Sequence, residues 1–433
     1  MKYEDIENNL FIENRTKLRK LLNNNSLAIF QSNDEFPKSG DQDFPFKQNA
    51  DLFYLSGIDQ EQTILLIYPD CPNPLYKEVL FLRQTNDNIK IWEGHKYTKT
   101  LARKASGIQS VYWLDDFEPI LNSIVSYADY VYLNMNENVT SSYAVPYRDI
   151  RFIEHMKAKY PLHRYERAAP LMRQLRDKKS AGEVHLILKA CEITRDAFLR
   201  VLKFTRPGVT EYEIEAEIIH EFIRKRATGH AYPPIIASGK NANILHYSDN
   251  NQICEQGDLV LMDFGAEYAN YNADMTRTIP LSGRFTPRQK EVYNAVVNVM
   301  KEAKKILSPG LSPKEYNQSV AAFMTEQLVG LRLLSINDVK NQDPAFPLYK
   351  KYFMHGISHH LGLDVHDFAD RYAPFSEGNV LTCEPGIYIP EEGFGIRLEN
   401  NILLKKDGNI DLMENIPLEA EEIEEIMNST SYL

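Results

Sequence analysis

Short apolar runs separated by turn residues dominate the first third of the chain. The clearest of them are 27–30, 63–68, 78–82 and 130–133, and runs of this length bounded by turn residues are typical of strands. A helical pattern over 15–22 precedes the first run, and further helical patterns lie between some of the others. Strands interleaved with helices predict an α/β layer structure for this part of the chain.

The pattern changes near residue 170, beyond which helices have well-marked starts. A capping residue followed by Glu, or by Pro in the first turn, predicts where a helix begins, and this signature occurs at Ser180 with Glu183, Thr210 with Glu213, Thr286-Pro287 and Ser312-Pro313. Strands and glycine turns lie between and after these helices. We therefore predict a mixed α/β (α+β) fold with two domains, 1–170 and 171–433.

Composition narrows the class of protein. The 433 residues carry a formal net charge of -11 with no long basic run, which argues against nucleic acid or an acidic membrane surface as a partner. No apolar segment approaches the roughly 18 residues that a membrane span needs, and the acidic start does not resemble a signal peptide. The cysteines lack CxxC spacing and are typical of reduced thiols. We expect a cytoplasmic protein.

Residues 352–367 concentrate the side chains that titrate and bind metals near neutral pH. This glycine-punctuated run holds four of the eleven histidines of the chain, His355, His359, His360 and His366. A single histidine most often satisfies a local hydrogen bond. The interpretation of this run therefore depends on the acidic residues elsewhere in the chain.

Two of these acidic residues are Asp263 and Asp274. Asp263 interrupts the apolar, strand-like run 259–266, and Asp274 follows a polar turn at 267–272. A hairpin would bring the two carboxylates side by side, where their repulsion requires a cation. Thr276 would place a hydroxyl nearby. The alternative is that Asp263 caps a turn and Asp274 is exposed.

Two glutamates follow the histidine run. Glu384 precedes a Pro-Gly turn, and the segment 395–399 places Arg397 and Glu399 on the same face of a predicted strand. Such an Arg and Glu, taken alone, are most often a surface ion pair.

Together, these residues suggest a dinuclear metal site. The charges of four carboxylates balance two divalent cations, which leaves a bridging hydroxide as the additional ligand, and the predicted ligands are Asp263, Asp274, His359, Glu384 and Glu399. Carboxylate and imidazole without thiolate favour Mn²⁺, Co²⁺ or Zn²⁺ over copper, and manganese before the others. Two such ions lower the pKa of a bound water. We therefore predict hydrolysis, with an amide as the substrate.

The segments around these five residues resemble the metal-binding segments of the pita-bread metallopeptidases. Within that group the chain is most similar to the aminopeptidase P family (Xaa-Pro aminopeptidases), followed by the Xaa-Pro dipeptidases (prolidases). Residues 44–57 resemble the characteristic sequence of the N-terminal domain of that family, and Trp92-Glu93-Gly94 resembles its Trp-x-Gly. The resemblance covers nearly the whole chain. It implies a creatinase-like N-terminal domain, a pita-bread catalytic domain, and cleavage of the bond between an N-terminal residue and a following proline.

The resemblance also implies a role for each site residue. Asp274 and Glu399 would bridge the two cations, and Glu384 would also transfer the proton of the attacking hydroxide. His246 and His366 would bind and polarise the scissile carbonyl, since a bond before proline has no amide hydrogen to recognise. His355 would line the pocket beside the leaving proline, and Arg397 would hold a carboxylate or a group behind the ligands. The family commonly forms homodimers or homotetramers, in which Trp92 would reach the active site of a neighbouring subunit.

Several departures from the family pattern leave alternatives open. His360 stands where an aromatic residue is usual and is expected at the pocket wall or behind the ligands. Asn400-Asn401 replaces a common Asp-Asp, and we expect this to change the groups behind the ligands and hence the metal affinity. The connection 389–395 is short, which leaves a prolidase possible. A catalytically inactive, peptide-binding relative is the other alternative, although such proteins lose metal ligands. Serine catalysis is not supported, because no GxSxG sequence is present.

Overall fold

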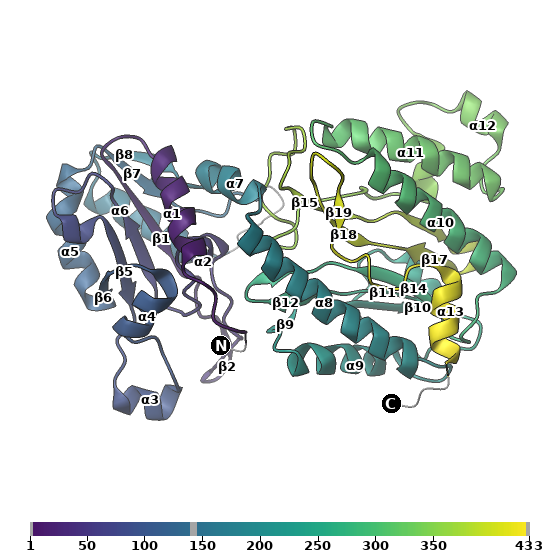
Figure 1. Cartoon of the computed structure of the whole chain (residues 1–433), viewed down its shortest axis with the longest axis horizontal. Coiled ribbons are helices and arrows are strands. Elements are labelled where there is room, and N and C mark those ends of the chain that lie inside the picture. Colours follow the sequence, from purple (N-terminus) through teal and green to yellow (C-terminus); the bar gives the residue numbers. More distant parts are fainter. Residues whose placement is uncertain (1–2, 139–144, 430–433) are drawn as a thin grey trace. The chain divides into compact units, whose positions relative to one another are not determined.

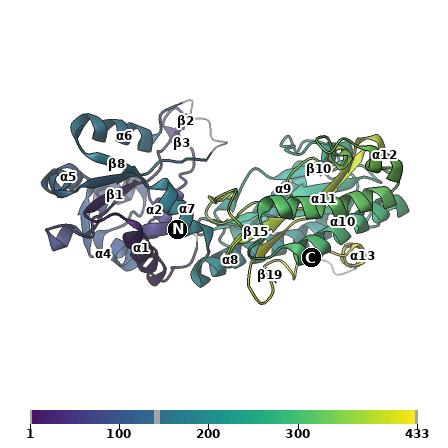
Figure 2. The ribbon, with the colours of Figure 1, turned by 90° about the horizontal axis from the view of Figure 1, so that it is seen from above.

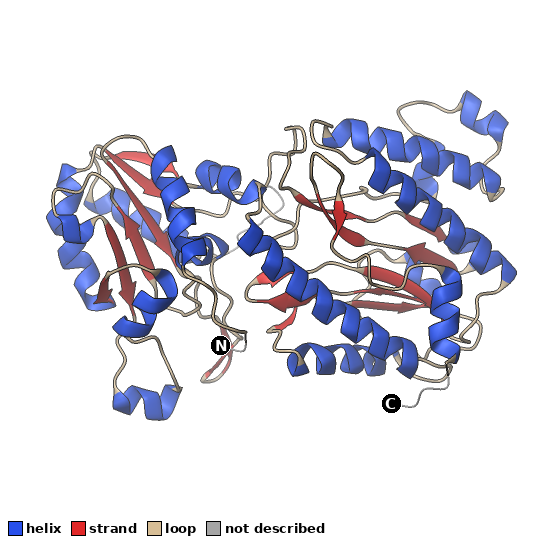
Figure 3. Ribbon diagram, viewed as in Figure 1, coloured by secondary structure: helices blue, strands red, loops and turns tan. Residues whose placement is uncertain are grey.

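The computed structural model describes residues 3–138 and 145–429. The chain divides into two compact units, Tyr3–Arg176 and Asp177–Leu433. Both units mix helices and strands (Figure 3), which confirms the predicted α/β class. No helix among the described residues is both long and apolar enough to span a membrane.

The first unit contains a six-stranded sheet in the order β6-β5-β4-β1-β7-β8 (Figure 1). The pairs β1–β4 and β4–β5 are antiparallel, whereas β1–β7, β5–β6 and β7–β8 are parallel. The four predicted strands are confirmed as members of this sheet. The strand bounds are β1 Ser26–Gln31, β4 Ile64–Ile67, β5 Glu78–Leu82, β6 Ser110–Trp113, β7 Tyr130–Leu133 and β8 Arg164–Arg167, with a separate hairpin of β2 Pro37–Ser39 and β3 Gln42–Asp43.

Helices complete the first unit. Leu121 and Met156, from two of these helices, pack with Phe81 and Val131 of the sheet in one apolar core. The helix predicted from residue 15 begins six residues earlier, at Asn9. The helix bounds are α1 Asn9–Leu21, α2 Ala50–Ser56, α3 Asp87–Glu93, α4 Lys99–Ser106, α5 Phe117–Ile124, α6 Arg148–Lys159 and α7 Ala169–Asp177.

The second unit begins with the helices that the capping pattern predicts. In each of four helices the N-cap hydroxyl and the side chain three residues later form a reciprocal capping box, which satisfies amide hydrogens that the first turn cannot pair. α10 packs along α11 (Figure 2), and α8 packs along α9 (Figure 1). The bounds are α8 Ala181–Phe204, α9 Glu211–Arg224, α10 Pro287–Ile306, α11 Pro313–Gly330, α12 Ile336–Asn341 and α13 Ala420–Asn428.

The strands of the second unit form small antiparallel sheets, and the helices flank them (Figure 1). The sheet orders are β10-β11-β14, β13-β12-β9, β15-β18-β19 and β16-β17. The bounds are β9 Gly229–His230, β10 Ile235–Ser238, β11 Leu259–Asp263, β12 Ala266–Tyr268, β13 Tyr271–Asn272, β14 Thr276–Pro280, β15 Val380–Cys383, β16 Gly386–Ile389, β17 Phe394–Arg397, β18 Asn400–Leu403 and β19 Ile410–Asp411.

The segment between the two predicted aspartates differs from the expected polar turn. It forms a short hairpin of β12 and β13, turned by Ala269 and Asn270 with φ of 51° and 65°. Such a pair of left-handed residues matches the twist of two-residue hairpins. The hairpin is buried, because α8 packs against both of its strands. Polarity alone therefore gave the wrong prediction for this stretch.

Candidate metal centre

The predicted pairing of strands brings the two aspartates together. β11 and β14 are antiparallel, and Asp263 stands opposite Thr276, two residues after Asp274. The close approach depends on Gly265, where an added Cβ would lie 1.8 Å from the Ala273 carbonyl oxygen. A side chain at Gly265 would force the two segments apart, so glycine is a requirement of the site geometry.

The two glutamates lie next to strands of the sheets β15-β18-β19 and β16-β17. Glu384 follows the last residue of β15, and Glu399 lies between β17 and β18. The single strand predicted through Arg397 and Glu399 is therefore wrong, since the chain leaves one sheet and enters another between them. The Glu399 amide donates to the Thr276 carbonyl at 3.0 Å, and the Thr276 hydroxyl donates to Glu399 Oε2 at 2.7 Å. The expected hydroxyl of Thr276 thus joins the two halves of the site.

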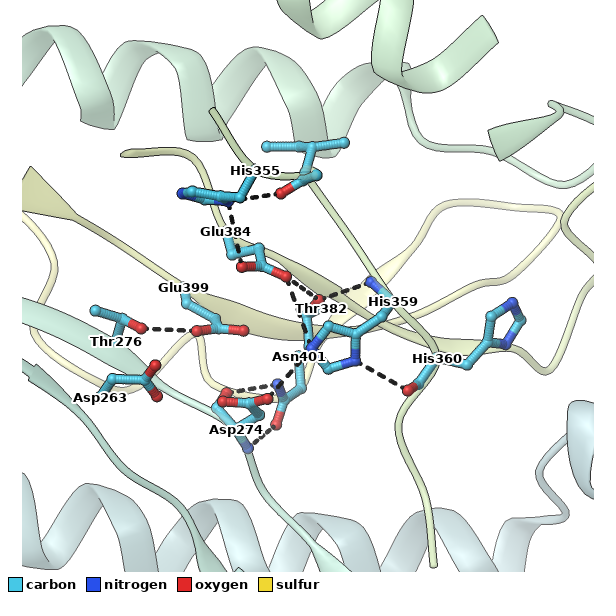
Figure 4. Close-up of polar contacts among 12 residues, drawn as sticks. Asp263, Asp274, Thr276, His355, His359, His360, Thr382, Glu384, Glu399 and Asn401 are labelled. Carbon is cyan, nitrogen blue, oxygen red and sulfur yellow. Dashed lines mark hydrogen bonds and ion pairs between the residues drawn. The ribbon is translucent and has the colours of Figure 1, made fainter. Parts of the chain in front are cut away.

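His359 presents one ring nitrogen to the carboxylates (Figure 4). Its amide donates to Thr382 Oγ1 at 3.0 Å, and its Nδ1 lies 3.0 Å from the His360 carbonyl oxygen. A proton on Nδ1 satisfies that carbonyl and leaves the lone pair on Nε2. Nε2 lies 3.4 Å from Asp274 Oδ2 and 3.6 Å from Glu384 Oε1. This is the orientation a histidine needs to bind a cation.

Three of the five predicted ligands already form a ligand-like triad. Asp274, His359 and Glu399 each offer an atom, and these atoms lie within 4.8 Å of one another. Asp263 and Asp274 are joined through Tyr232, whose hydroxyl oxygen lies 2.6 Å from Asp263 Oδ1 and 2.5 Å from Asp274 Oδ1. One hydroxyl hydrogen serves one carboxylate at a time, so excess negative charge remains.

The electrostatics of the carboxylates favour a cation between them. Burial, together with Asp274 and Glu384, raises the pKa of Glu399 well above its ordinary range. Burial and neighbouring aspartates likewise raise the pKa of Glu384 to about 7, although His359 opposes the shift. Carboxylates so placed must be protonated or must share a cation. Oxygen and imidazole donors without thiolate suit a hard or borderline divalent ion, so the residues present fit the predicted metals.

Arg397 donates hydrogen bonds to three side chains of the protein. Its Nη2 donates to Asp263 Oδ2 at 2.6 Å, its Nη1 to the Tyr388 hydroxyl at 2.9 Å and its Nε to Thr276 Oγ1 at 3.1 Å. The carboxylate that Arg397 holds is therefore that of a predicted ligand. Its guanidinium geometry suits several simultaneous contacts, and it fixes Asp263 in orientation.

A cavity of about 610 Å³ brings together nine of the ten predicted site residues, all in the second unit. Its wall also includes apolar side chains such as Leu245 and Val365. The predicted residues that line it are His246, Asp263, Asp274, His355, His359, His366, Glu384, Arg397 and Glu399. Carboxylates and imidazoles converging in one partly apolar cavity are typical of a catalytic site.

The three other histidines of the cavity differ in environment. His355 Nε2 lies 2.8 Å from the Tyr388 hydroxyl, and burial lowers the pKa of His355 to about 4. The His366 ring packs edge-on against His359, with centroids 4.4 Å apart. His246 is exposed at the cavity surface. These histidines thus line the same cavity as the predicted ligands.

Tyr232, Tyr388 and Thr382 are site residues that the sequence did not reveal. Tyr232 contacts two predicted ligands, Tyr388 contacts both Arg397 and His355, and Thr382 contacts His359 and Glu384. Tyr232 precedes two prolines, and Thr382 and Tyr388 flank Glu384 closely in the chain. No periodicity distinguishes a hydroxyl that binds a ligand from one that packs in the core, so only the fold identifies them.

The sequence matches the models of two known protein families. Residues 185–406 match the model of metallopeptidase family M24, and residues 11–132 match that of the aminopeptidase P N-terminal domain. The chain belongs to metallopeptidase family M24. Its first unit therefore represents the N-terminal domain that accompanies M24 peptidases of the aminopeptidase P type, as the resemblance implied.

Similar M24 proteins match over nearly their full length. The Xaa-Pro aminopeptidases of Haemophilus influenzae and Escherichia coli are each 33% identical, over 96% and 98% of this chain and 97% and 98% of their own. A putative aminopeptidase P from Bacillus anthracis is similar in structure, with a TM-score of 0.90, 33% identity and 98% coverage of both chains. Zinc-substituted E. coli aminopeptidase P in complex with product has a TM-score of 0.86 and 30% identity, over 98% of this chain and 99% of that chain. These similarities bear out the predicted family and two-part architecture.

Asn401 and His360, two departures from the family pattern, differ in how they contact the site. Asn401 Nδ2 donates to the Asp274 carbonyl at 2.6 Å, and the Asp274 amide donates to Asn401 Oδ1 at 3.1 Å. An amide side chain can make both bonds because it donates and accepts. The His360 side chain, by contrast, points away from the ligands (Figure 4) and is absent from the cavity wall. The pocket-wall alternative for His360 is wrong, and its carbonyl alone supports the site.

Trp92 is the one predicted site residue that does not line this cavity. It lies on α3 in the first unit, and 88% of its surface is exposed. Its expected role in a neighbouring subunit therefore stays a prediction.

Replacing Asn401 by alanine is expected to lower the free energy of unfolding by about 2–3 kcal/mol, because a buried amide and a buried carbonyl of Asp274 lose their partners. Urea unfolding of metal-free protein measures this loss without a contribution from ligand binding. The exposed Asn341 of α12 provides the control, and Asn341→Ala should change the value by less than about 0.5 kcal/mol. Equal effects of the two substitutions would contradict the role given to Asn401.

Proposed function

We propose that this M24 protein removes the N-terminal residue from peptides whose second residue is proline. The observation that carries the proposal is the convergence of four carboxylates and His359 in one cavity, with three further histidines around it. Proteins named Xaa-Pro aminopeptidase that match nearly the whole chain support the substrate class.

The five residues that would hold two divalent cations are Asp263, Asp274, His359, Glu384 and Glu399. We propose Mn²⁺, with Co²⁺ or Zn²⁺ as substitutes, since the donors are carboxylate oxygen and imidazole nitrogen. When bound, the two ions supply a nucleophile from water at neutral pH and withdraw charge from the scissile carbonyl. Tyr232 and Arg397 keep Asp263 oriented toward the site.

Glu384 is the proposed proton carrier. In the metal-free protein, burial and neighbouring aspartates raise the pKa of Glu384 to about 7, and a carboxyl group held in such a buried, polar site can act as a general acid and base. The nitrogen of a bond before proline carries no hydrogen, and it must gain one before it can leave. Glu384 would accept the proton of the attacking water and deliver it to that nitrogen.

The surrounding histidines would bind the substrate. His246 and His366 would donate hydrogen bonds to the scissile carbonyl, whose oxygen gains negative charge during the reaction. His355 would lie beside the proline ring, since the low pKa of its imidazole keeps it neutral at pH 7. The apolar wall residues Leu245 and Val365 suit the methylene groups of proline.

A paired assay tests the proposal. Protein stripped of metal and reconstituted with Mn²⁺ is given an Xaa-Pro-Yaa tripeptide, an Xaa-Pro dipeptide and a proline-free tripeptide. We expect fastest release of the first residue from the Xaa-Pro tripeptide. Turnover of the dipeptide alone would identify a dipeptidase. Absence of cleavage in protein that holds metal would identify a peptide-binding module.

We further propose a cytoplasmic location and a homodimer or homotetramer. All four cysteines are buried free thiols, as expected in a reducing compartment. On α3, 77% of Ile91 and 88% of Trp92 are exposed, and apolar side chains presented together suit a protein contact. Light scattering measures the oligomeric state directly.

A further inference from the structure

Glu211 is a fully buried carboxylate outside the cavity, and it accepts five hydrogen bonds. It is the first residue of α9, and its relative exposure is 0%. Oε1 accepts from the Ser238 amide at 2.8 Å, the Ser238 hydroxyl at 2.7 Å and Asn241 Nδ2 at 3.2 Å. Oε2 accepts from the Tyr247 hydroxyl at 2.7 Å and the Gln252 amide at 2.9 Å. A buried carboxylate with this many donors is held in one orientation.

The five donors belong to one segment, residues 238–252. This segment leaves β10, passes through a short 3-10 turn at Gly239–Asn243 and carries His246 at the cavity. Beyond that turn it forms no regular helix or strand. Its two ends, Ser238 and Gln252, and its middle, Tyr247, are all tied to the same carboxylate. Glu211 thus replaces the backbone pairing that regular structure would provide.

The contacts of its neighbours turn His246 toward the cavity. Tyr247 packs with Ala242, Leu261 and Tyr388 in an apolar cluster, and Leu245 packs against the same cluster. The residues on both sides of His246 are thereby anchored, while the His246 side chain remains exposed. A shift of Tyr247 would move its neighbour in the chain.

We propose that Glu211 is a positioning residue, which fixes the segment 238–252 and so holds His246 against the scissile carbonyl. The inference rests on the proposed function, because it assigns the orientation of a histidine that this function uses. Glu211 touches neither the cavity nor a predicted metal ligand, so its effect must pass through the segment. A misplacement of about 1 Å at a substrate-binding group is enough to cost about a hundredfold in rate.

A double-mutant cycle with His246 tests this assignment. Glu211→Gln keeps the size of the side chain but replaces one acceptor with a donor that faces existing donors. We expect it to lower kcat/KM for an Xaa-Pro tripeptide by about tenfold to a hundredfold, mainly in kcat. In a His246→Ala background the same change should cost less than about threefold, since the group that it positions is gone. Equal losses in both backgrounds would overturn the inference.

Two further variants control for a general loss of folding. Glu221, also buried on α9, accepts from Arg224 and contacts none of the five donors; Glu221→Gln should leave kcat/KM within about twofold. Tyr247→Phe removes one bond to Glu211, so it should give a smaller loss that also depends on His246. If Glu211→Gln does not fold, this second cycle decides the question, and a loss that is independent of His246 overturns the inference.

Amide hydrogen exchange tests whether Glu211 anchors the segment 238–252 without relying on catalysis. Glu211→Gln should accelerate exchange at Ser238 and Gln252 more than Glu221→Gln does, because only the first loses acceptors for these amides. Unchanged exchange at both amides would overturn the inference. A wild-type protein that cleaves no Xaa-Pro peptide would overturn the proposed function together with the inference. An active wild type with independent Glu211 and His246 effects would overturn the inference alone.

Discussion

Replacing Glu384 by glutamine is expected to lower kcat for an Xaa-Pro tripeptide by on the order of 10³-fold, because positioned acid–base groups contribute about 10²- to 10⁴-fold. Glutamine keeps the size and the acceptor oxygen of the side chain, which lies 3.3 Å from Thr382 Oγ1, but it cannot carry a proton. Steady-state kinetics on Mn²⁺-loaded protein measure the loss.

The environment of Glu384 explains why this effect should be large. Its Oε1 lies 3.6 Å from His359 Nε2, and its Oε2 lies 3.7 Å from His355 Nδ1. In the metal-free protein, burial raises its pKa to about 7, and a bound cation favours the carboxylate form that can accept a proton.

Metal content must be measured in parallel, since Glu384 is also a proposed ligand. The exposed Glu391 serves as the matched control, as it pairs with Lys351 at 2.7 Å near the surface, and Glu391→Gln should leave kcat unchanged. A Glu384→Gln protein that holds its metal and keeps kcat within about tenfold of wild type would contradict the proton-carrier role.

The sequence predicted those parts of the structure that depend on local chemistry. The capping pairs, such as Ser180 with Glu183, define helix starts because their hydrogen bonds lie within one turn. The aspartates could be paired because an apolar strand with one charge, followed by a turn and a second charge, has few stable arrangements. The cavity contains all five predicted ligands.

The missed features depend on contacts between distant segments. Tyr232 reaches Asp274 across 42 positions, and Asn401 reaches the same residue across 127. Arg397 and Glu399 are two residues apart but belong to different sheets, which a period of two along one strand cannot reveal. Glu211 is an acid in the first turn of a helix, a position that local sequence does not distinguish from others. The return of residues 238–252 onto the helix start gives it five hydrogen bonds from four residues.

Removing the metal is expected to abolish peptidase activity and to make the stability of the second unit depend on pH in a defined direction. In the metal-free protein, burial and neighbouring aspartates raise the pKa of Glu384 to about 7, against about 4.3 in an unfolded chain. Although burial opposes it, contact with Asp274 and Glu384 raises the pKa of His359 to about 9, against about 6.5 when unfolded. Both groups bind protons more tightly in the folded state.

The sign of the effect follows from this difference in proton binding. A group that holds its proton more tightly when folded stabilises the protein at low pH, and this stability is lost as pH rises through the folded pKa. Glu384 therefore loses its contribution between about pH 4.3 and 7, and His359 between about pH 6.5 and 9. His355, whose pKa is lowered to about 4, acts in the opposite direction, but only below about pH 6.5. The Tm of metal-free protein should thus fall from pH 6.5 to pH 9.

Divalent cations should reverse this trend, because they take the place of the protons that the site loses. At a Mn²⁺ concentration about a thousandfold above Kd, binding adds about 4 kcal/mol, which corresponds to a rise in Tm of about 10 °C for a unit of this size. Ligands must be deprotonated to bind metal, so the rise should be larger at pH 8.5 than at pH 6.5. His359→Ala provides the control, and its Tm should respond little to Mn²⁺ at either pH. Calorimetric scans with and without Mn²⁺ measure all four conditions, and an equal rise at both pH values would contradict the assignment of His359 and Glu384 as ligands.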